Sequence, residues 1–586
     1  MRMQRCKSSA LALLGLVMGL SGAQATEYVQ APPLSSVIKT PVAACNSFRE
    51  LPVPVIAWGA DEANIYANGN TPATASGSIF AQKGLSVRLY REDRLAKQVE
   101  DYLSCKTPLL RGTVGMLAQA SDVLNADPRT APVVIFQLSW SEGGDAVSVR
   151  EGIKEPRDLA GKTVVLQAYG PHVDYLTTIL KSAGVPASQV NIKWVKDLVG
   201  GDSNPAQALR DDPSVTATFV ISPDANALSS GGKVGTGAED SVRGAHTMLS
   251  TKTANRIIAD VYAVRRDWYD ANPDKVFALV HGMMLGQEAT KRLVAEQQQN
   301  KRAYEEWTKA SAKMLLDNEQ AVEDAAGMWA DANTVGWKGN VAFFADNSNP
   351  RNLSRITSEI SEAFVALRLI AKPAAFTPAV LDYEKLSEGL SDIAGVEASR
   401  FDQQAVEKLV RERQQQDRLE EGQLFSFEIR FKPNQQGFSM DLYGAEFDRV
   451  IELVSTYGGA LLTIEGHADT LGYLKRKQNP MATPEELSRM KQGAKNLTLQ
   501  RANAVRDALM QYAGAKNITL DKNQMSTVGH GFAKPNVSGC VYDANGDVTN
   551  SCAPKTEPEW DAMRRVVFRV VSVEAEMDKF QSLDVK

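Results

Sequence analysis

Between residue 51 and about residue 270 the chain alternates short apolar runs with segments of helical periodicity. Eight of the apolar runs have the length and composition typical of strands: VPVIAW, LSVRLY, APVVIFQLSW, DAVSVR, KTVVLQ, VNIKWV, TATFVIS and IADVYAVR. Apolar residues at helical spacing lie between them, as in VDYLTTILKSAG. Because strands that alternate with helices pack into layered structures, this pattern predicts an α/β fold with largely parallel sheets.

The chain has 586 residues, more than one hydrophobic core normally organises, so we expect at least two domains. Residues 273–371 carry apolar residues at helical spacing, and these helices are expected to pack on the preceding lobes. Residues 402–422 predict a charged linker helix with a thin apolar stripe, Val406, Leu409 and Val410. A dimeric coiled coil is the alternative for this helix, although its apolar heptads are few.

The first 25 residues have the pattern of a cleavable signal peptide. Arg2, Arg5 and Lys7 precede the apolar run ALALLGLVMGL, and small residues follow up to Ala25. The run is too short to span a membrane, and no other stretch approaches that length. We therefore expect an exported protein of the periplasm, without direct membrane insertion. The net charge of −5 is small for this length and does not indicate a nucleic-acid partner.

Four cysteines remain after the leader: Cys45, Cys105, Cys540 and Cys552. An even number in an oxidising compartment predicts two disulfides. Sequence does not fix their connectivity, but pairing within each half of the chain requires no contact between distant domains. A metal site is the alternative, disfavoured because the spacing is not C-x-x-C and no His lies nearby.

A ligand cleft is expected beyond the carboxyl ends of the strands, where loops meet helix N-termini. Aromatic side chains, hydroxyls and turn amides gather at four such places. The candidate cleft residues are Trp58, Asp61, Asn64, Ser139, Trp140, Ser141, Tyr169, His172, Ser222 and Asp224. Each has a plain structural alternative, such as core packing for the tryptophans or helix capping for the aspartates.

An enzyme is not expected. His172 and Asp174 with nearby serines form only a weak hydrolytic pattern, and G-x-S-x-G, H-E-x-x-H and P-loop motifs are absent from the sequence. The sequence therefore indicates no catalytic residue, no cofactor and no metal.

The order PVIAWGADEAN, VVIFQLSWSEGGDAVSV, DLAGKTVVLQAYGPHVDYL and FVISPDANAL resembles periplasmic solute-binding proteins of ABC importers, in the nitrate and sulfonate class. The resemblance covers about residues 50–385. It implies a bilobed type 2 periplasmic-binding-protein fold, with DAVSV crossing to the second lobe and IADVYAVR returning. It also implies a small-molecule ligand and a membrane permease as partner.

The C-terminal part reads as SFEIRF (strand), YGAEFDRVIELVSTYG (helix), ALLTIEGHAD (strand), LTLQRANAVRDALMQYAG (helix), MSTVGHGF (strand) and RRVVFRVVSVE (strand). With GHADT, LTLQRANAVRDAL, VGHGFAKP and RRVVF in this order, residues 424–575 closely resemble the α+β OmpA-like peptidoglycan-binding domain. The resemblance implies that Asp469 and Arg501 hold the diaminopimelate of the wall stem peptide. Thr470, Leu497 and Thr498 match positions that line that pocket.

An acid and a bidentate cation suit the ammonium and carboxylate of diaminopimelate. Amides at the start of the second helix are expected to add hydrogen bonds to the carboxylate. A purely structural ion pair between Asp469 and Arg501 is the alternative. The chain departs from the family pattern by the insertion YLKRKQNPMATPEELSRMKQGAK and by Ala494 and Met563, which stand where asparagines are usual.

The expected organisation is a signal peptide (1–25), an extended lead-in (26–50), a bilobed domain (51–385), a linker (386–423), an OmpA-like domain (424–576) and a tail (577–586). The expected function is that of a periplasmic small-solute-binding protein anchored noncovalently to peptidoglycan. The alternative is a cell-envelope scaffold or assembly factor in which the solute-binding fold serves protein–protein interaction.

Overall fold

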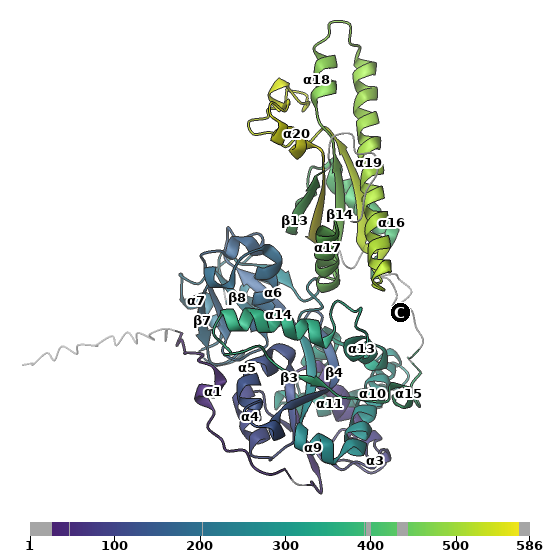
Figure 1. Cartoon of the computed structure of the whole chain (residues 1–586). Coiled ribbons are helices and arrows are strands. Elements are labelled where there is room, and N and C mark those ends of the chain that lie inside the picture. The colour runs from purple at the N-terminus through teal and green to yellow at the C-terminus, as the bar shows by residue number, and fades with distance from the viewer. Residues whose placement is uncertain are drawn as a thin grey trace, which may run out of the picture.

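The computed structural model describes residues 26–573, apart from residues 46, 202, 239, 392, 394–399 and 431–442. The expected signal peptide and the tail at 577–586 lie outside the described residues. Two α/β lobes form one end of the molecule, and a smaller unit built on one sheet stands on them (Figure 1).

The first lobe is built around the sheet order β11-β4-β10-β3, beside the parallel pair β1-β2. Its strands are β1 (Leu51–Val55), β2 (Val87–Arg91), β3 (Leu109–Thr113), β4 (Pro132–Ser141), β10 (Ala259–Arg265), β11 (Ala332–Thr334) and β12 (Thr377–Pro378). Its helices are α2 (Glu62–Ala67), α3 (Ile79–Gln82), α4 (Leu95–Leu103), α5 (Val114–Leu124), α9 (Arg266–Ala271), α10 (Pro273–Ala295), α11 (Lys301–Leu316), α12 (Val322–Asp331), α13 (Gly336–Phe344), α14 (Leu353–Ala366) and α15 (Tyr383–Leu386). Every residue of β4 and β10 is buried, as expected for central strands with near-continuous apolar runs.

The second lobe has the sheet order β7-β6-β8-β5-β9. Its strands are β5 (Asp145–Val149), β6 (Thr163–Gln167), β7 (Asn191–Val195), β8 (Ala217–Ile221) and β9 (His246–Ser250), and its helices are α6 (His172–Ala183), α7 (Pro205–Asp211) and α8 (Ser222–Leu228). The chain crosses between lobes from β4 to β5 and returns from β9 to β10. Two α/β lobes with two crossings form the bilobed fold that the sequence predicts.

The eight predicted strands are all confirmed, but β3 and β9 are additional. Their sequences, LLRGT and HTMLS, are interrupted by polar residues or glycine and therefore lack the apolar run used to find the others. The expectation of largely parallel sheets is only partly right. The pairs β1–β2, β6–β7 and β6–β8 are parallel, whereas β5 and β10, which adjoin the crossings, are antiparallel to their neighbours.

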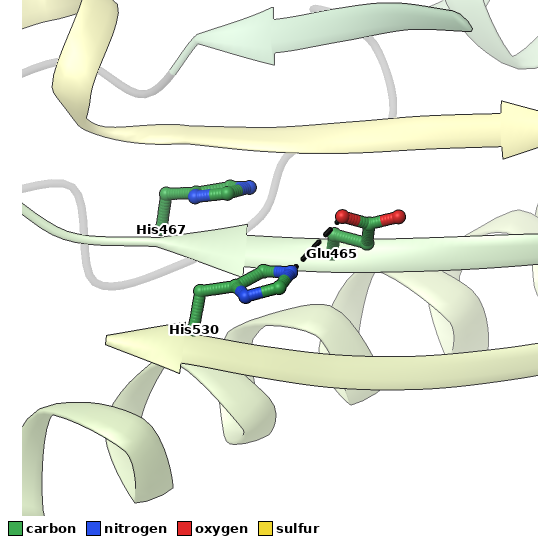
Figure 2. A group of neighbouring side chains, drawn as sticks. All are labelled: Glu465, His467 and His530. Carbon is green, nitrogen blue, oxygen red and sulfur yellow. Dashed lines mark hydrogen bonds and ion pairs between the residues drawn. The ribbon is translucent and has the colours of Figure 1, made fainter. Parts of the chain in front are cut away.

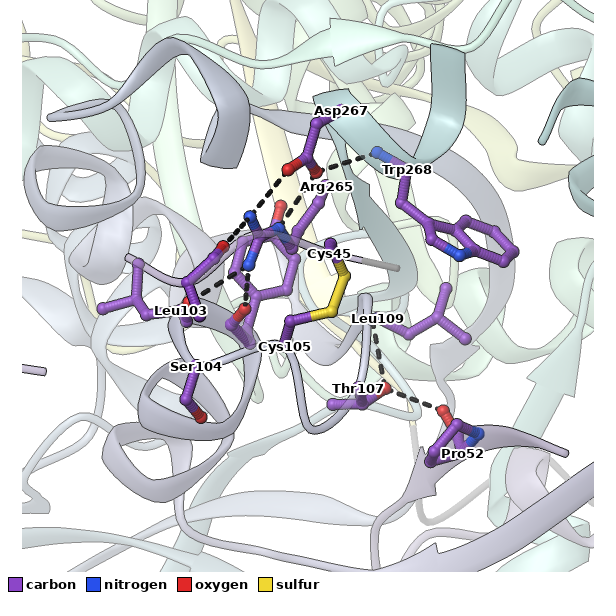
Figure 3. Close-up of a disulfide and its surroundings, with 12 residues drawn as sticks. Cys45, Pro52, Leu103, Ser104, Cys105, Thr107, Leu109, Arg265, Asp267 and Trp268 are labelled. Atoms are coloured by element: carbon purple, nitrogen blue, oxygen red, sulfur yellow. Dashed lines mark hydrogen bonds and ion pairs between the residues drawn. A yellow bond between two sulfur atoms is a disulfide. The ribbon is translucent and has the colours of Figure 1, made fainter. Parts of the chain in front are cut away.

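The lead-in is bound along both lobes. Val29 bridges to Trp194 on β7, and α1 (Leu34–Val37) packs against α5. Cys45 forms a disulfide with Cys105, which confirms the first expected pair. Figure 3 shows the buried Arg265 guanidinium beside this disulfide, where it donates to the carbonyls of Tyr102, Leu103 and Ala43. The disulfide and Arg265 together fasten the lead-in to the first lobe.

The C-terminal unit contains the sheet order β13-β16-β14-β15. Its strands are β13 (Gln423–Arg430), β14 (Ala460–His467), β15 (Met525–Gly531) and β16 (Arg565–Ser572), and its helices are α17 (Gly444–Thr456), α18 (Leu471–Lys477), α19 (Pro484–Ala515) and α20 (Glu557–Met563). Leu462 and Ile464 face α17 and α19, whereas Leu461 faces the other side of the sheet. The strands and helices expected for this region are present in the predicted order, and α18 and α20 are additional.

The linker helix α16 (Gln403–Gln415) covers that other side. Its apolar stripe, Val406, Leu409 and Val410, is buried against Leu461 and Val528 of the sheet. The stripe is therefore used within the chain, by packing on the C-terminal unit.

The C-terminal unit docks on the segment that joins β9 to β10. The amide of Gly459 donates to the carbonyl of Thr253 (3.1 Å), and the amide of Arg256 donates to the carbonyl of Thr456 (3.2 Å). An ion pair joins Lys181 of α6 to Glu452 of α17 (2.9 Å). The unit is thus attached at a crossing between the lobes. No helix among the described residues is long and apolar enough to span a membrane.

Candidate functional site

Trp58 and Ser139 meet where β1 and β4 end in the first lobe. The indole Nε1 of Trp58 donates to Ser139 Oγ (3.0 Å), and that hydroxyl donates to Asp260 Oδ2 (3.1 Å). Ser139 and Asp260 are buried, and Trp58 is partly buried. Three residues distant in sequence therefore form one hydrogen-bonded chain at the boundary between the lobes.

Arg111 lies at the centre of this network and is fully buried. Its guanidinium pairs with Asp61 Oδ2 (2.9 Å) and with Asp260 Oδ1 (2.8 Å). Burial raises the pKa of Asp260 to about 6, although Arg111 acts in the opposite direction. Tyr262 completes the cluster, because its hydroxyl lies 3.1 Å from Asp61 Oδ1 and accepts from Asn64 Nδ2 (3.3 Å). Asp61 and Asn64 thus belong to a buried charged network.

A second network lies on the side of the second lobe. Ser141 Oγ donates to Asp145 Oδ2 (2.6 Å), and His172 Nε2 donates to Asp145 Oδ1 (2.7 Å). The hydroxyl of Thr251 accepts from the amides of Gly143 (2.9 Å) and Asp145 (3.1 Å). Both chain crossings therefore contribute to this network, through Ser141 to Asp145 and through Thr251.

The carboxylate of Asp174, in the first turn of α6, is buried without a hydrogen-bond partner. It is 1% exposed, and neither carboxylate oxygen has a hydrogen-bond partner. His172 Nδ1 is also buried and without a partner. Burial raises the pKa of Asp174 to about 8, with Asp145 and Asp260 adding to the rise and Arg351 opposing it. Unpartnered polar groups of this kind are costly unless something satisfies them.

The remaining candidates of the cleft lie outside these two networks. Trp140 is buried and packs edge-on against Phe343. Tyr169 donates its hydroxyl to the carbonyl of Pro32, and Ser222 donates to the carbonyl of Gly143. Asp224 lies in the first turn of α8, where burial raises its pKa. Trp140, Tyr169 and Ser222 thus have local packing or bonding roles.

The sequence reading did not include Asp145, Thr251 or Asp260 among the candidates. Asp145 and Asp260 stand at the starts of the two strands that follow the crossings, DAVSV and IADVYAVR. An acidic residue near the start of an otherwise apolar strand is the sequence feature that would have indicated these two aspartates.

The candidate wall site lies at the end of β14 and on α19. Asp469 Oδ1 accepts from the amide of Leu471 (3.2 Å), and Arg501 makes no hydrogen bond or ion pair with any described residue. No ion pair joins Asp469 to Arg501 in the described part of the chain. Thr470 donates to the carbonyl of Cys552 (2.7 Å), and Thr498 accepts from the amide of Gly531 (2.9 Å). Leu497 is 46% exposed. Asp469 and Arg501 thus have no ion-pair partner among the described residues, whereas both threonine hydroxyls form hydrogen bonds with the backbone of the same unit.

The expected start of the second helix is wrong. Helix α19 begins at Pro484, inside the insertion, so Leu497 and Arg501 lie in its middle. The backbone amides there belong to the helix and are not free. The expected amide hydrogen bonds from a helix N-terminus to the ligand carboxylate are therefore excluded at this position.

The insertion forms a hairpin of α18 and the first half of α19, which projects away from the lobes (Figure 1). The second expected disulfide, Cys540–Cys552, is confirmed and closes a loop that packs on this hairpin. Lys477 pairs with Asp543 and Asp547 of the loop, each at 2.9 Å. Tyr473 donates its hydroxyl to Asp547 (2.5 Å). The loop therefore braces the hairpin against the sheet.

No family model matches the chain, and no curated protein matches it in sequence. Among solved structures, the alkanesulfonate-binding protein SsuA from Xanthomonas axonopodis pv. citri bound to MOPS is 13% identical, with a TM-score of 0.37, covering 57% of this chain and 100% of that one. The periplasmic aliphatic sulphonate-binding protein SsuA from Escherichia coli is 12% identical, with a TM-score of 0.39, covering 60% and 98%. The desulfurization enzyme DSZB is 15% identical, with a TM-score of 0.34, covering 56% and 95%. The fold described above rests on the strand order and the two crossings.

Proposed function

We propose that this protein is a periplasmic solute-binding protein that its C-terminal unit anchors to peptidoglycan. The observation that carries the first half is the boundary between two lobes joined by two crossings, where Asp174 and His172 leave buried polar atoms unpartnered. A polar solute that donates hydrogen bonds would satisfy these groups as the lobes close on it. Such a solute would pass to a membrane permease, and the pattern of residues 1–25 agrees with export.

The anchoring half of the proposal rests on Asp469 and Arg501. One is an acidic and the other a basic side chain, and neither is ion-paired with a described residue. A zwitterionic diaminopimelate end group presents an ammonium to the acid and a carboxylate to the guanidinium. The long α19 and its hairpin leave these two charges without the helix-end amides, so the two side chains carry the recognition.

The test is sedimentation of the purified full chain with diaminopimelate-type peptidoglycan at physiological salt. Wild type is expected in the pellet, and Asp469→Ala and Arg501→Ala are expected in the supernatant. Asp507→Ala removes an exposed acid of the same helix and serves as the matched control, which should sediment like wild type. A soluble wild type, or equal sedimentation of all four proteins, would contradict wall binding through these residues.

A second candidate function is an envelope scaffold. It is favoured by the interactions of the expected cleft residues within the protein itself, as in Trp58 with Ser139 and Asp61 with Arg111. Thermal stabilisation that grows with the concentration of a small solute, tested first with nitrate and an alkanesulfonate, would favour solute binding. A partner protein crosslinked in cells, without stabilisation by any solute of a broad panel, would favour the scaffold.

A further inference from the structure

Three ionisable side chains gather at the ends of two neighbouring strands in the C-terminal unit. Glu465 and His467 belong to β14, and His530 belongs to β15, which pairs in parallel with β14. Figure 2 shows the three side chains on one face of the sheet. They are 1%, 3% and 5% exposed, respectively, so the cluster is shielded from bulk water.

The geometry of the cluster is compact. His530 Nε2 lies 3.0 Å from Glu465 Oε2, and the rings of His467 and His530 stack with centroids 4.7 Å apart. One nitrogen or oxygen atom from each residue lies within 4.8 Å of the others. Two ligands of one tetrahedral zinc ion stand about 3.3 Å apart, given metal–ligand bonds of about 2.0 Å. The ligand atoms would therefore have to move closer to one another when an ion binds.

His467 supplies an independent observation. Neither of its ring nitrogens has a hydrogen-bond partner, although the side chain is almost completely buried. An imidazole nitrogen that no other group uses is the atom through which histidine binds metal ions.

Glu465 is already oriented by other groups. Its Oε1 accepts from Thr463 Oγ1 (2.8 Å) and from Arg569 Nε (2.9 Å), while Oε2 faces His530. Metal-bound carboxylates are commonly held in this way, with one oxygen on the ion and the other on a supporting donor. Because Oε1 is held by Thr463 and Arg569, Oε2 is the oxygen that would bind a metal ion.

Two arginines near the cluster oppose a cation, but each faces a further carboxylate. Arg569 lies 3.3 Å from Glu420, and Arg565 lies 3.4 Å from Glu428. The positive charges are thus balanced outside the cluster, and Glu465 contributes its own charge to the site.

We propose that Glu465, His467 and His530 bind one divalent transition-metal ion of the zinc class. Two imidazoles and one carboxylate suit zinc, cobalt, nickel or copper and do not suit calcium or magnesium, which prefer oxygen ligands. The ion would join the ends of β14 and β15 two residues before Asp469. It would thereby fix the turn that presents Asp469, and its binding is independent of whether that turn contacts peptidoglycan.

The test uses the metal-free full chain with Co²⁺ as a spectroscopic probe and Zn²⁺ as competitor. We expect visible d–d absorption at one Co²⁺ per chain, bleached by Zn²⁺, and a rise in melting temperature with Zn²⁺ but not with Ca²⁺. His467→Phe and His530→Phe preserve an aromatic stack and should each weaken binding by at least about 100-fold. His281→Gln, on α10 in the first lobe, should bind like wild type.

The proposal is overturned if wild type shows neither d–d absorption nor stabilisation by Zn²⁺, or if both phenylalanine variants bind metal as wild type does. Circular dichroism of each variant establishes that it is folded. Because metal binding is measured without peptidoglycan, a failure here leaves the sedimentation result unaffected, and the reverse also holds.

Discussion

Asp174 of the second lobe lies directly against Gly115 in the first turn of α5 of the first lobe. A Cβ placed on Gly115 would lie 2.4 Å from Asp174 Oδ1, which is closer than real Cβ atoms approach any neighbour. The two lobes therefore meet here in a contact that only glycine permits. A substitution of Gly115 therefore tests how closely the two lobes approach each other.

Gly115→Ala is expected to prevent the lobes from meeting as they do in this structure. Overpacking of a tight contact typically costs about 1–3 kcal/mol, so the midpoint of urea unfolding should fall. Small-angle scattering should show a more open molecule. Gly327→Ala, in α12, meets no atom within 4 Å and is the matched control, expected to change neither quantity. Equal behaviour of the two variants would show that the contact does not limit closure.

Asp174 should make stability depend on pH. Its pKa is raised to about 8 by burial, whereas an unfolded aspartate has a pKa of about 4, so the folded chain holds an extra proton between these values. The free energy of unfolding should therefore fall as the pH rises from about 4 to about 8 and level off above that. Each unit of pKa difference corresponds to about 1.4 kcal/mol, so the effect amounts to several kcal/mol.

Asp174→Asn removes this ionisation while keeping the size of the side chain. Its urea midpoint should exceed that of wild type at pH 8, and the difference should shrink at pH 5. Comparing the two proteins at each pH cancels the titration of other groups, such as Asp260. Parallel pH profiles for the two proteins would exclude Asp174 as the source.

Arg111→Met should be strongly destabilising, because it leaves Asp61 and Asp260 as unpaired carboxylates in a fully buried place. Removing one partner of a buried ion pair costs about 3–5 kcal/mol. Arg129→Met breaks an exposed pair with Asp127 and should cost less than about 1 kcal/mol. Chemical denaturation of both variants measures the contrast, and similar losses would argue against a role for burial.

Gly459→Ala tests the attachment of the C-terminal unit to the lobes. A Cβ at this position would lie 1.9 Å from the carbonyl oxygen of Lys252, a backbone atom that cannot move aside on its own. We expect the unit to detach, with a larger radius of gyration in scattering and faster proteolysis of the linker. Gly472→Ala, in α18, meets no atom within 4 Å and should leave both readouts unchanged. An unchanged radius of gyration for Gly459→Ala would refute the docked arrangement.

Much of the fold follows from local pattern, because a buried strand needs a run of apolar residues wherever its partners lie. The two networks at the lobe boundary do not follow in this way. Ser139 and Asp260 are 121 residues apart, and only the pairing of β4 with β10 brings them together. The same holds for His467 and His530, which the parallel pairing of β14 with β15 makes neighbours.

The start of α19 was predicted wrongly for a different reason, because the residues that mark a helix start are present in the sequence. Thr483 caps the helix by accepting from the amide of Glu486 (3.2 Å), Pro484 occupies the first turn, and two glutamates follow. A threonine, a proline and acids in this order are typical of a helix start. Alignment of the C-terminal pattern to a family with a shorter connection concealed it.

Helix α19 sets a distance. At about 1.5 Å per residue, Pro484 lies about 26 Å along the axis from Arg501. One continuous helix therefore fixes the distance between the tip of the hairpin and Arg501, the charge expected to contact peptidoglycan. A second molecule that touches the tip is held at a fixed height above whatever Arg501 binds, and lengthening or shortening the insertion by whole turns would change that height in steps of about 5.4 Å.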